Sequence, residues 1–243
     1  QMSGRISNLL ETRVESEKEK KDLEIKMLQA QINPHFLYNT LDSIKWIATM
    51  QKNSGIVSVV TALSSLLKNM AKGFNEKVTL RQELDFLQNY VIIEKIRYIE
   101  LFDIDIIVDQ EELYDARIIK LTLQPIVENS FIHGIKPMDG PGHIQLMAER
   151  LDNTVTLRGM DNGVGMDEDA LNKLYTLLDS DQPGHKENYE WASIGLKNVH
   201  DRLRYLYGSD YGITLYSTPG VGTVVKATIP ADLQNLAQEE PLC

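Results

Sequence analysis

Two short amphipathic helices are predicted between residues 34 and 70 by the spacing of their apolar side chains. In both segments apolar residues recur every three or four positions, which places them on one face of a helix. The first segment carries Leu37, Leu41, Ile44 and Ala48. After a turn signal at Asn53–Gly55, the second carries Val57, Val60, Leu63, Leu67 and Met70. Each helix has a single apolar face, so the pattern predicts a helical hairpin that can close a four-helix bundle with a second copy.

Two further helices are predicted on either side of this hairpin. Residues 5–31 contain no Gly or Pro and favour a single helix, but Glu11–Asp22 in its middle is almost entirely charged. Such a helix buries little apolar surface, so we expect it to need a partner helix or a structured neighbour. Gly73 ends the hairpin, a hinge is expected near Gly73–Lys77, and Arg81–Tyr98 is predicted to be a connecting helix.

The pattern changes at Leu101, where strands and helices begin to alternate. Phe102–Val108 alternates apolar and acidic residues, as a half-buried strand does. The further strands predicted are His143–Ala148, Thr154–Arg158, Tyr211–Ser217 and Thr223–Ile229, and the helices are Leu121–Ile135, Asp167–Leu178 and Gly195–Tyr207. The polar stretch Asp179–Ser193 is expected to be a mobile loop. Together the elements predict an α+β fold, in which the N-terminal helical hairpin is followed by a two-layer α/β sandwich.

Composition narrows the classes of partner and site. The chain has 243 residues, a formal net charge of -10 and a pI near 5.0, which disfavours nucleic acid and anionic membrane surfaces as partners. The single cysteine, Cys243, excludes a disulfide framework and a cysteine-based metal site. No apolar run is long enough to span a bilayer and no secretory leader is visible. Because the chain opens on Gln1, we expect it to be a fragment of a longer protein.

The first candidate for chemistry is the stretch Ile32–Thr40, INPHFLYNT. Pro34 has no backbone N–H, so it either begins a helix or kinks one. On that helix His35 and Asn39 lie away from the apolar face, which makes the imidazole reachable by a partner. The alternative is an ordinary surface histidine beside a kink.

The second candidate lies on the predicted helix Leu121–Ile135. Asn129 and His133 are four residues apart and share a face, with Glu128 beside them. A carboxylate, an amide oxygen and an imidazole could together hold a hydrated Mg²⁺ ion, which prefers oxygen ligands. The alternative is a helix whose polar face meets solvent.

Two glycine-containing stretches complete the candidates. Asp161, Gly163 and Gly165 follow a strand, where the glycines allow close approach to a ligand and Asp161 can accept a hydrogen bond from an amine such as that of adenine. Gly195 opens a predicted helix, whose free N–H groups suit phosphates. Either stretch can also be an ordinary turn or helix start.

The order of these stretches resembles the N, G1 and G2 boxes of the Bergerat ATP-binding fold. Asn on a helix, Asp-x-Gly-x-Gly after a strand, a polar lid and Gly-Leu at a helix start occur in sensor histidine kinases, gyrase, Hsp90-type chaperones and mismatch-repair ATPases. With INPHFLYN upstream, the chain is similar to the sensor histidine kinases of the LytS/YesM-like subgroup from about residue 26 to 230.

The resemblance implies a role for each candidate residue. His35 would be the phosphoacceptor and Asn39 would orient it, while Glu128 would act as a base or hold a water. Asn129 would ligate Mg²⁺, and Asp161 would bind adenine. The remaining cofactor-binding residues would be Gly163 and Gly165 in the base pocket and His133, Gly195, Leu196 and Asn198 on the phosphate side.

The resemblance also implies a division of the chain. Residues 1–33 would be a signalling helix or coiled-coil linker, 34–77 the dimerisation and phosphoacceptor hairpin, and 78–100 a connecting helix. Residues 101–232 would be the ATP-binding catalytic domain and 233–243 a tail.

Two positions and one missing box depart from the wider histidine kinase pattern. Phe36 replaces the acidic residue that often follows the phosphorylated histidine, so the base for His35 stays open. Ser193 replaces the first glycine of the G2 box, and a Phe-rich box between G1 and G2 is not recognisable.

The implied function is a homodimeric protein histidine kinase that uses ATP and Mg²⁺ and passes the phosphoryl group to an aspartate of a response regulator. It would be the cytoplasmic portion of a bacterial cell-membrane protein, whose sensor region lies N-terminal to the fragment. Two alternatives stay open: a Bergerat-fold ATPase without histidine phosphorylation, in which Glu128 activates water, and a non-catalytic dimeric scaffold that binds partners through its hairpin.

Overall fold

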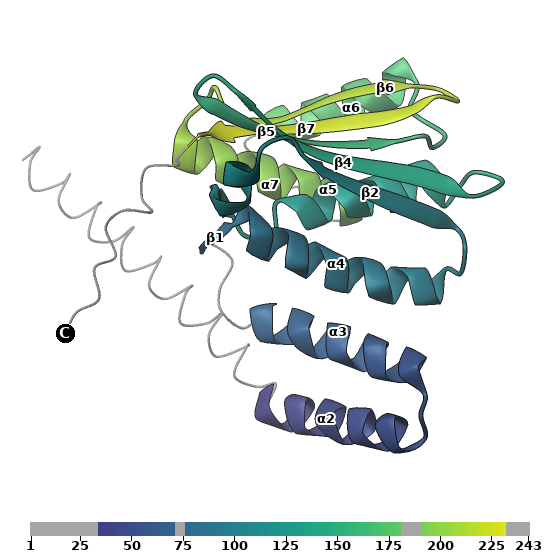
Figure 1. The fold of residues 1–243 in the computed structure, drawn as a ribbon. Coiled ribbons are helices and arrows are strands. Elements are labelled where there is room, and N and C mark those ends of the chain that lie inside the picture. The colour runs from purple at the N-terminus through teal and green to yellow at the C-terminus, as the bar shows by residue number, and fades with distance from the viewer. Residues whose placement is uncertain (1–33, 71–75, 181–190, 232–243) are drawn as a thin grey trace, which may run out of the picture. The chain divides into compact units, whose positions relative to one another are not determined.

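The computed structural model describes residues 34–70, 76–180 and 191–231 (Figure 1). The predicted helix over residues 5–31 and most of the predicted loop Asp179–Ser193 lie outside the described residues. The chain divides into two compact units, residues 1–64 and 65–243, and the division falls inside a helix of the predicted hairpin.

The predicted hairpin is confirmed as two helices, α2 (Pro34–Met50) and α3 (Ser54–Met70). Asn53 starts α3, because its side-chain oxygen accepts a hydrogen bond from the backbone N–H of Ile56 at 3.2 Å. Large apolar side chains of α2 are exposed: Phe36 is 66% and Met50 70% exposed. The hairpin therefore presents apolar surface that these two helices do not bury.

The connecting helix is α4 (Leu80–Arg97), close to its predicted bounds. Thr79 and Gln82 form a reciprocal capping box at its start. Two strands and a 3₁₀ turn beside it were not predicted: β1 (Lys77–Thr79), β3 (Arg117–Ile119) and η1 (Glu111–Asp115). β1 pairs antiparallel with β3, so Lys77, expected in the hinge, belongs to a strand.

The main sheet contains the five predicted strands: β2 (Phe102–Val108), β4 (Gly142–Leu151), β5 (Thr154–Asp161), β6 (Gly212–Thr218) and β7 (Gly222–Pro230). Their order is β2-β4-β5-β7-β6, with β2 parallel to β4 and the other pairs antiparallel. Short turns connect β4 with β5 and β6 with β7, as antiparallel neighbours allow.

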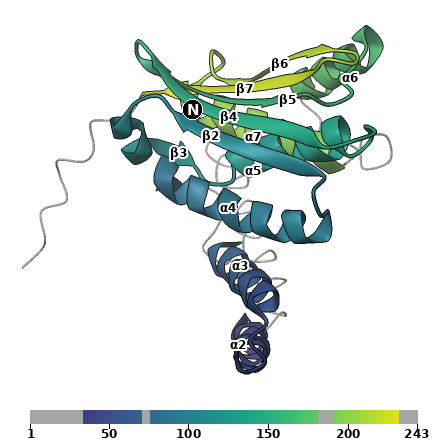
Figure 2. The same cartoon turned by 45° about the vertical axis from the view of Figure 1, so that its right-hand side comes forward.

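Helices cover one face of this sheet, as Figures 1 and 2 show for α5 (Leu123–Asn129) and α7 (Trp191–Tyr207). The core between them is fully buried and includes Leu123, Ile126, Leu157, Leu196, Leu203 and Val225. The predicted two-layer α/β sandwich is confirmed. The remaining helix, α6 (Glu168–Asp179), begins after Asp167, whose carboxylate accepts from Ala170 N–H at 2.8 Å.

Two predicted helix boundaries were wrong. The helix expected from Leu121 to Ile135 is α5 followed by a π-helical segment, η2 (Ser130–Ile135), with Lys136 N–H bonded to Phe131 O at 2.9 Å. α7 begins at Trp191, four residues before the predicted start at Gly195. Both differences fall in the segments that carry candidate ligand-binding residues.

Candidate functional site

Asp161 ends β5 with its carboxylate almost fully buried at 8% residue exposure. Oδ1 accepts hydrogen bonds from the backbone N–H groups of Gly163 at 3.0 Å and Thr223 at 3.2 Å. Oδ2 is buried and has no hydrogen-bond partner among the described residues. The backbone thus fixes one oxygen, while the other is a buried acceptor whose hydrogen-bonding capacity is not used by the described residues.

Burial is the main influence on the Asp161 carboxylate, and it raises the pKa above the ordinary value. The Gly163 and Thr223 N–H groups oppose this by stabilising the anion. The nearby Ser130 hydroxyl also lowers the pKa, although its oxygen is not in hydrogen-bond geometry with either carboxylate oxygen. A buried acceptor of this kind fits an amine donor, because leaving it unbonded costs free energy.

Glycines bring three segments into backbone contact around Asp161. A Cβ on Gly163 would lie 2.3 Å from the backbone of Gly134 in η2, and one on Gly165 would lie 2.0 Å from Thr218 O. Gly165 also has φ +66°, where a side chain is strained. Val164 N–H donates to Gly134 O at 2.8 Å, which ties the loop to η2. Gly163 and Gly165 are therefore required by the neighbouring backbone, and Gly134 is a partner that the sequence analysis missed. The close approach of these glycines to a ligand stays a prediction.

The end of α5 carries the second group of candidates. Asn129 is buried at the last position of α5, Glu128 is half-buried beside it, and His133 follows in η2, partly exposed. Burial raises the pKa of Glu128, and the negative charge of Glu94 on α4 raises it further. A π-helical segment at this point is typical of functional sites. Among the described residues, no group of three or more His, Cys, Asp and Glu side chains could hold a metal ion.

A buried carboxylate that the sequence analysis missed fixes the start of α5. Glu83 of α4 is 1% exposed and accepts from the backbone N–H groups of Leu121 at 2.9 Å, Thr122 at 2.8 Å and Leu123 at 3.0 Å. These are the donors that a helix N-terminus leaves without partners. Burial raises the pKa of Glu83, while these bonds and Arg202 oppose the shift. The sequence signal that could have indicated this buried carboxylate is the position of Glu83 within the apolar stripe of α4.

Three of the four phosphate-side candidates, Gly195, Leu196 and Asn198, lie on α7. Gly195 is in the second turn, where a helical N–H is already bonded to the carbonyl four residues earlier. The free N–H groups at this end belong to residues 191–193, so the expected anion site cannot rest on the Gly195 N–H in this conformation. Leu196 is buried in the core, and Asn198 is exposed. Of the three, only Gly195 and Asn198 leave atoms near the surface of α7.

His35 lies in the first turn of α2 and is exposed. Asn39 Nδ2 lies 3.3 Å from His35 Nδ1 and 3.4 Å from Nε2. The amide can donate to whichever ring nitrogen is unprotonated, so it can orient the ring. The predicted pairing of an exposed imidazole with an amide one turn away is present.

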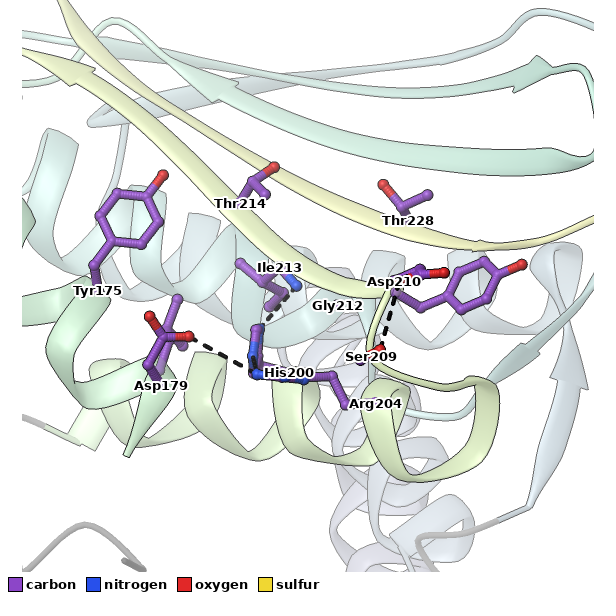
Figure 3. Close-up of a pocket in the computed structure, with 12 residues that line it drawn as sticks. Tyr175, Asp179, His200, Arg204, Ser209, Asp210, Gly212, Ile213, Thr214 and Thr228 are labelled. Atoms are coloured by element: carbon purple, nitrogen blue, oxygen red, sulfur yellow. Dashed lines mark hydrogen bonds and ion pairs between the residues drawn. The ribbon is translucent and has the colours of Figure 1, made fainter. Parts of the chain in front are cut away.

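A cavity of about 340 Å³ lies beside the edge strand β6, away from Asp161. His200 Nδ1 accepts from Ile213 N–H at 3.1 Å, as Figure 3 shows, and Tyr175 Oη accepts from Leu215 N–H at 3.1 Å. These side chains satisfy outward-facing backbone groups of β6, which protects the sheet edge from strand addition. Burial and the positive charge of Arg204 lower the pKa of His200. The two hydrogen bonds hold α6 and α7 to the edge strand.

Comparisons with known proteins give two family matches. Residues 23–102 match the family described as "Histidine kinase". Residues 114–233 match the family described as "Histidine kinase-, DNA gyrase B-, and HSP90-like ATPase". The first match includes His35, and the second includes Asn129, Asp161 and Gly195.

Three curated relatives align with nearly the whole chain. Sensor histidine kinase YesM of Bacillus subtilis is 35% identical over 94% of this chain and 37% of its own length. Sensor histidine kinase YpdA of Escherichia coli is 29% identical over 90% of this chain and 36% of its own length. Sensor protein kinase HptS of Staphylococcus aureus is 28% identical over 91% of this chain and 41% of its own length. The chain thus spans about two fifths of the length of these relatives. Among the described residues, no helix is both long and apolar enough to cross a membrane.

Proposed function

Because the chain belongs to the sensor histidine kinases of the LytS/YesM type, we propose that it binds ATP in its α/β unit and transfers the γ-phosphoryl group to His35. The observation that carries the proposal is the Asp161 carboxylate, with Oδ1 held by two backbone N–H groups and Oδ2 buried and open. That arrangement fits the exocyclic amine of adenine.

Each part of the site has a distinct task. Asp161 accepts a hydrogen bond from the adenine amine, and Gly163 and Gly165 let the loop backbone approach the base. Asn129 supplies an oxygen ligand to Mg²⁺, which commonly keeps waters and phosphate oxygens as its other ligands. When bound, the metal ion neutralises charge that develops on the transferred group. The phosphate-side contacts are assigned to His133 and Asn198, and to Gly195 and the backbone at Leu196 only if the first turns of α7 rearrange around the phosphates.

His35 is the proposed acceptor because it is exposed on a rigid helix and Asn39 can hold its ring. The form of histidine that can accept a phosphoryl group is the neutral ring. Its unprotonated nitrogen supplies the electron pair of the new N–P bond. The bond from the γ-phosphorus to the bridging oxygen breaks, and ADP leaves. Positioning supplies most of the rate, as in other phosphoryl transfers.

The partners follow from this reaction and from the exposed apolar side chains of α2. We infer that Phe36, Ile44 and Ile47 are covered in a homodimer whose hairpins form a four-helix bundle, because an exposed apolar face of this kind marks an interaction site. The phosphohistidine then donates to a response regulator aspartate. The proposed division keeps 1–33 as the signalling helix, 34–77 as the hairpin, 78–100 as the connector, 101–232 as the catalytic domain and 233–243 as the tail, in the cytoplasmic part of a membrane-anchored sensor.

A second candidate function is ATP hydrolysis without histidine phosphorylation. It is favoured by Glu128, whose raised pKa suits a group that exchanges protons with water. The two functions differ in the fate of the γ-phosphate: it is attached to His35 in the first and released in the second.

Labelled ATP with Mg²⁺ separates these functions. The kinase proposal predicts acid-labile label on the chain that is lost in His35→Ala, with nucleotide affinity unchanged. Acid-stable label, or label that persists in His35→Ala, would contradict it. Phosphate release that continues in His35→Ala and stops in Glu128→Gln would instead support hydrolysis. If the protein is a non-catalytic scaffold, neither the wild type nor an Asp161→Ala variant will bind ATP.

A further inference from the structure

Lys120 is a buried cation that the proposed chemistry does not use. It is 1% exposed and lies between β3 and α5. Its ammonium group donates to the backbone carbonyl of Asn69, in the last turn of α3, and lies 3.8 Å from a Glu76 carboxylate oxygen. The ring of Phe86 lies 5.7 Å away. Burying an ammonium group is costly without such partners, so their convergence fixes the side chain in place.

The carbonyl of Asn69 is one that the helix itself cannot satisfy, because the last four carbonyls of a helix have no intrahelical donor. A cation at this end also interacts favourably with the helix dipole. A second contact lies one turn earlier, where Asn89 Nδ2 donates to Ser65 Oγ at 3.4 Å. Ser65 and Asn69 are four residues apart and therefore share one face of α3. The end of α3 is thus held by polar contacts.

The backbone around Lys120 connects this anchor to the helices of the nucleotide site. Lys120 N–H donates to Glu76 O at 3.1 Å. Arg202 of α7 donates to Lys120 O at 3.0 Å and to Leu121 O at 2.9 Å. Glu83 holds the next N–H groups, where α5 begins. One short segment therefore joins the end of α3 to α5, which carries Asn129, and to α7.

We propose that Lys120 is a positioning residue for phosphoryl transfer, which holds the last turn of α3 in one register on the segment that starts α5. The inference rests on the proposed kinase function. α3 continues into the hairpin whose first helix, α2, carries His35, so a change of register at the last turn of α3 can be transmitted along this helix toward the phosphoacceptor. Small displacements of reacting groups change rates strongly, because transfer requires an in-line arrangement. Polar contacts suit this role, since they specify one geometry.

The test replaces Lys120 with methionine, which has a similar volume and no charge, in the full chain. Glu76 is half-exposed and can be solvated by water, so replacing a buried charge by an apolar isostere should leave the fold intact. We expect the single-turnover rate of His35 phosphorylation to fall about 10-fold or more. The affinity for a non-hydrolysable ATP analogue should change less than about twofold, since Asp161 and Asn129 are untouched. Lys226→Met, the same change on strand β7, is the matched control and should leave both quantities as in the wild type.

Three outcomes would overturn the proposal: an unchanged rate in Lys120→Met, an equal loss of rate and nucleotide affinity, or unfolding of the variant. Asn89→Ala provides an independent check, because it removes the other polar contact to α3 and should lower the rate by a smaller factor with affinity unchanged. An Asn89→Ala variant with the wild-type rate would also count against the proposal. Absence of His35 label in the wild type is a separate result, which would remove the kinase function itself.

Discussion

The two sides of the candidate nucleotide site are built differently. On the base side, the loop after β5 is held by backbone hydrogen bonds to η2 and to the β6–β7 turn, including Gly220 N–H to Val164 O at 2.7 Å. Gly163 lies against the backbone of η2, and Gly165 lies against the backbone at the end of β6. On the phosphate side, a Cβ on Gly195 would lie 3.4 Å from Pro125 Cβ, which is an ordinary contact between side chains. Asn198 is exposed.

The difference indicates which part of the site is formed before ligand arrives. Gly163 and Gly165 leave no room for a Cβ, so the fold determines the path of this loop, and we expect it to select adenine at little conformational cost. The phosphate side has looser packing and can adjust around the triphosphate and its metal ion. Rigid recognition of the base and adjustable contact with phosphates is a suitable division for an enzyme that must release ADP. Substitutions on the two sides should therefore differ in both size and sign.

The largest effect is expected for Gly163→Ala on the base side. A Cβ would lie 2.3 Å from the backbone of Gly134, and backbone cannot move aside as a flexible side chain can. We expect the free energy of unfolding to fall by about 3 kcal/mol or more, with nucleotide affinity lost as well. Urea denaturation measures this directly. A stable Gly163→Ala variant that binds ATP would show that the base side is not rigid.

Asp161→Asn should have the next largest effect, and on affinity more than on stability. The amide keeps an oxygen to accept from Gly163 and Thr223 but places a donor where Oδ2 was. Two donors would then face each other at the adenine amine, so we expect ATP affinity to fall about 10- to 100-fold. Isothermal titration of the ATP analogue provides the measurement. Equal affinity in the variant and the wild type would mean that Asp161 does not contact the base.

Much of the fold could be predicted from periodicity. The strand pattern at Phe102–Val108 matched its bounds because alternation is a direct consequence of having one face buried. β1 and β3 contain three residues each, too few for any period to be visible. The change from α-helix to π-helix at Ser130 leaves no mark in the hydrophobic pattern, because the same face stays buried. The early start of α7 was missed because the loop predicted from the polar residues before it extended to Ser193 and so included the first three residues of the helix.

The site residues that are close in sequence could be predicted from their spacing. Those that reach the site only through the packing of distant elements were missed. Asp161, Gly163 and Gly165 are close in sequence, so a single loop brings them together. Gly134 acts on that loop from a different element, and its role depends on how η2 crosses the end of β5. Glu83 is 38 residues from the first N–H that it binds, at Leu121. Only its charge within an apolar stripe could have indicated a buried partner.

A smaller effect is expected from His200, which holds the middle of α7 to β6. Burial, then Arg204, lowers its pKa, so the unfolded chain takes up a proton more readily than the folded one. The stability that this neutral ring supplies is complete above about pH 6.5 and is lost as the pH falls below it. Protonated Nδ1 could no longer accept from Ile213 N–H. His200→Asn retains an acceptor without a proton to gain.

The comparison with His200→Asn isolates this histidine from the others in the chain. Between pH 7.5 and 5.5, the wild type should lose about 1 kcal/mol more free energy of unfolding than the variant, the value of one hydrogen bond. Identical pH dependence of the two proteins would show that α7 is held to the sheet edge by other contacts. In that case the middle of α7, like its first turns, would belong to the part of the site that can adjust around the phosphates.

The smallest change, with opposite sign, is expected for Gly195→Ala on the phosphate side. Gly195 has helical neighbours on both sides and room for a methyl group beside Pro125, so alanine should raise the free energy of unfolding by about 0.5–1 kcal/mol. Thermal denaturation measures this gain, and the phosphorylation rate is then compared at the same temperature. If the first turns of α7 must rearrange around the phosphates, the more stable variant will phosphorylate His35 more slowly. If the rate is unchanged while stability rises, the phosphate side is already formed before the nucleotide binds, as the base side is. The two sides would then differ in how tightly they are packed and not in whether they must rearrange.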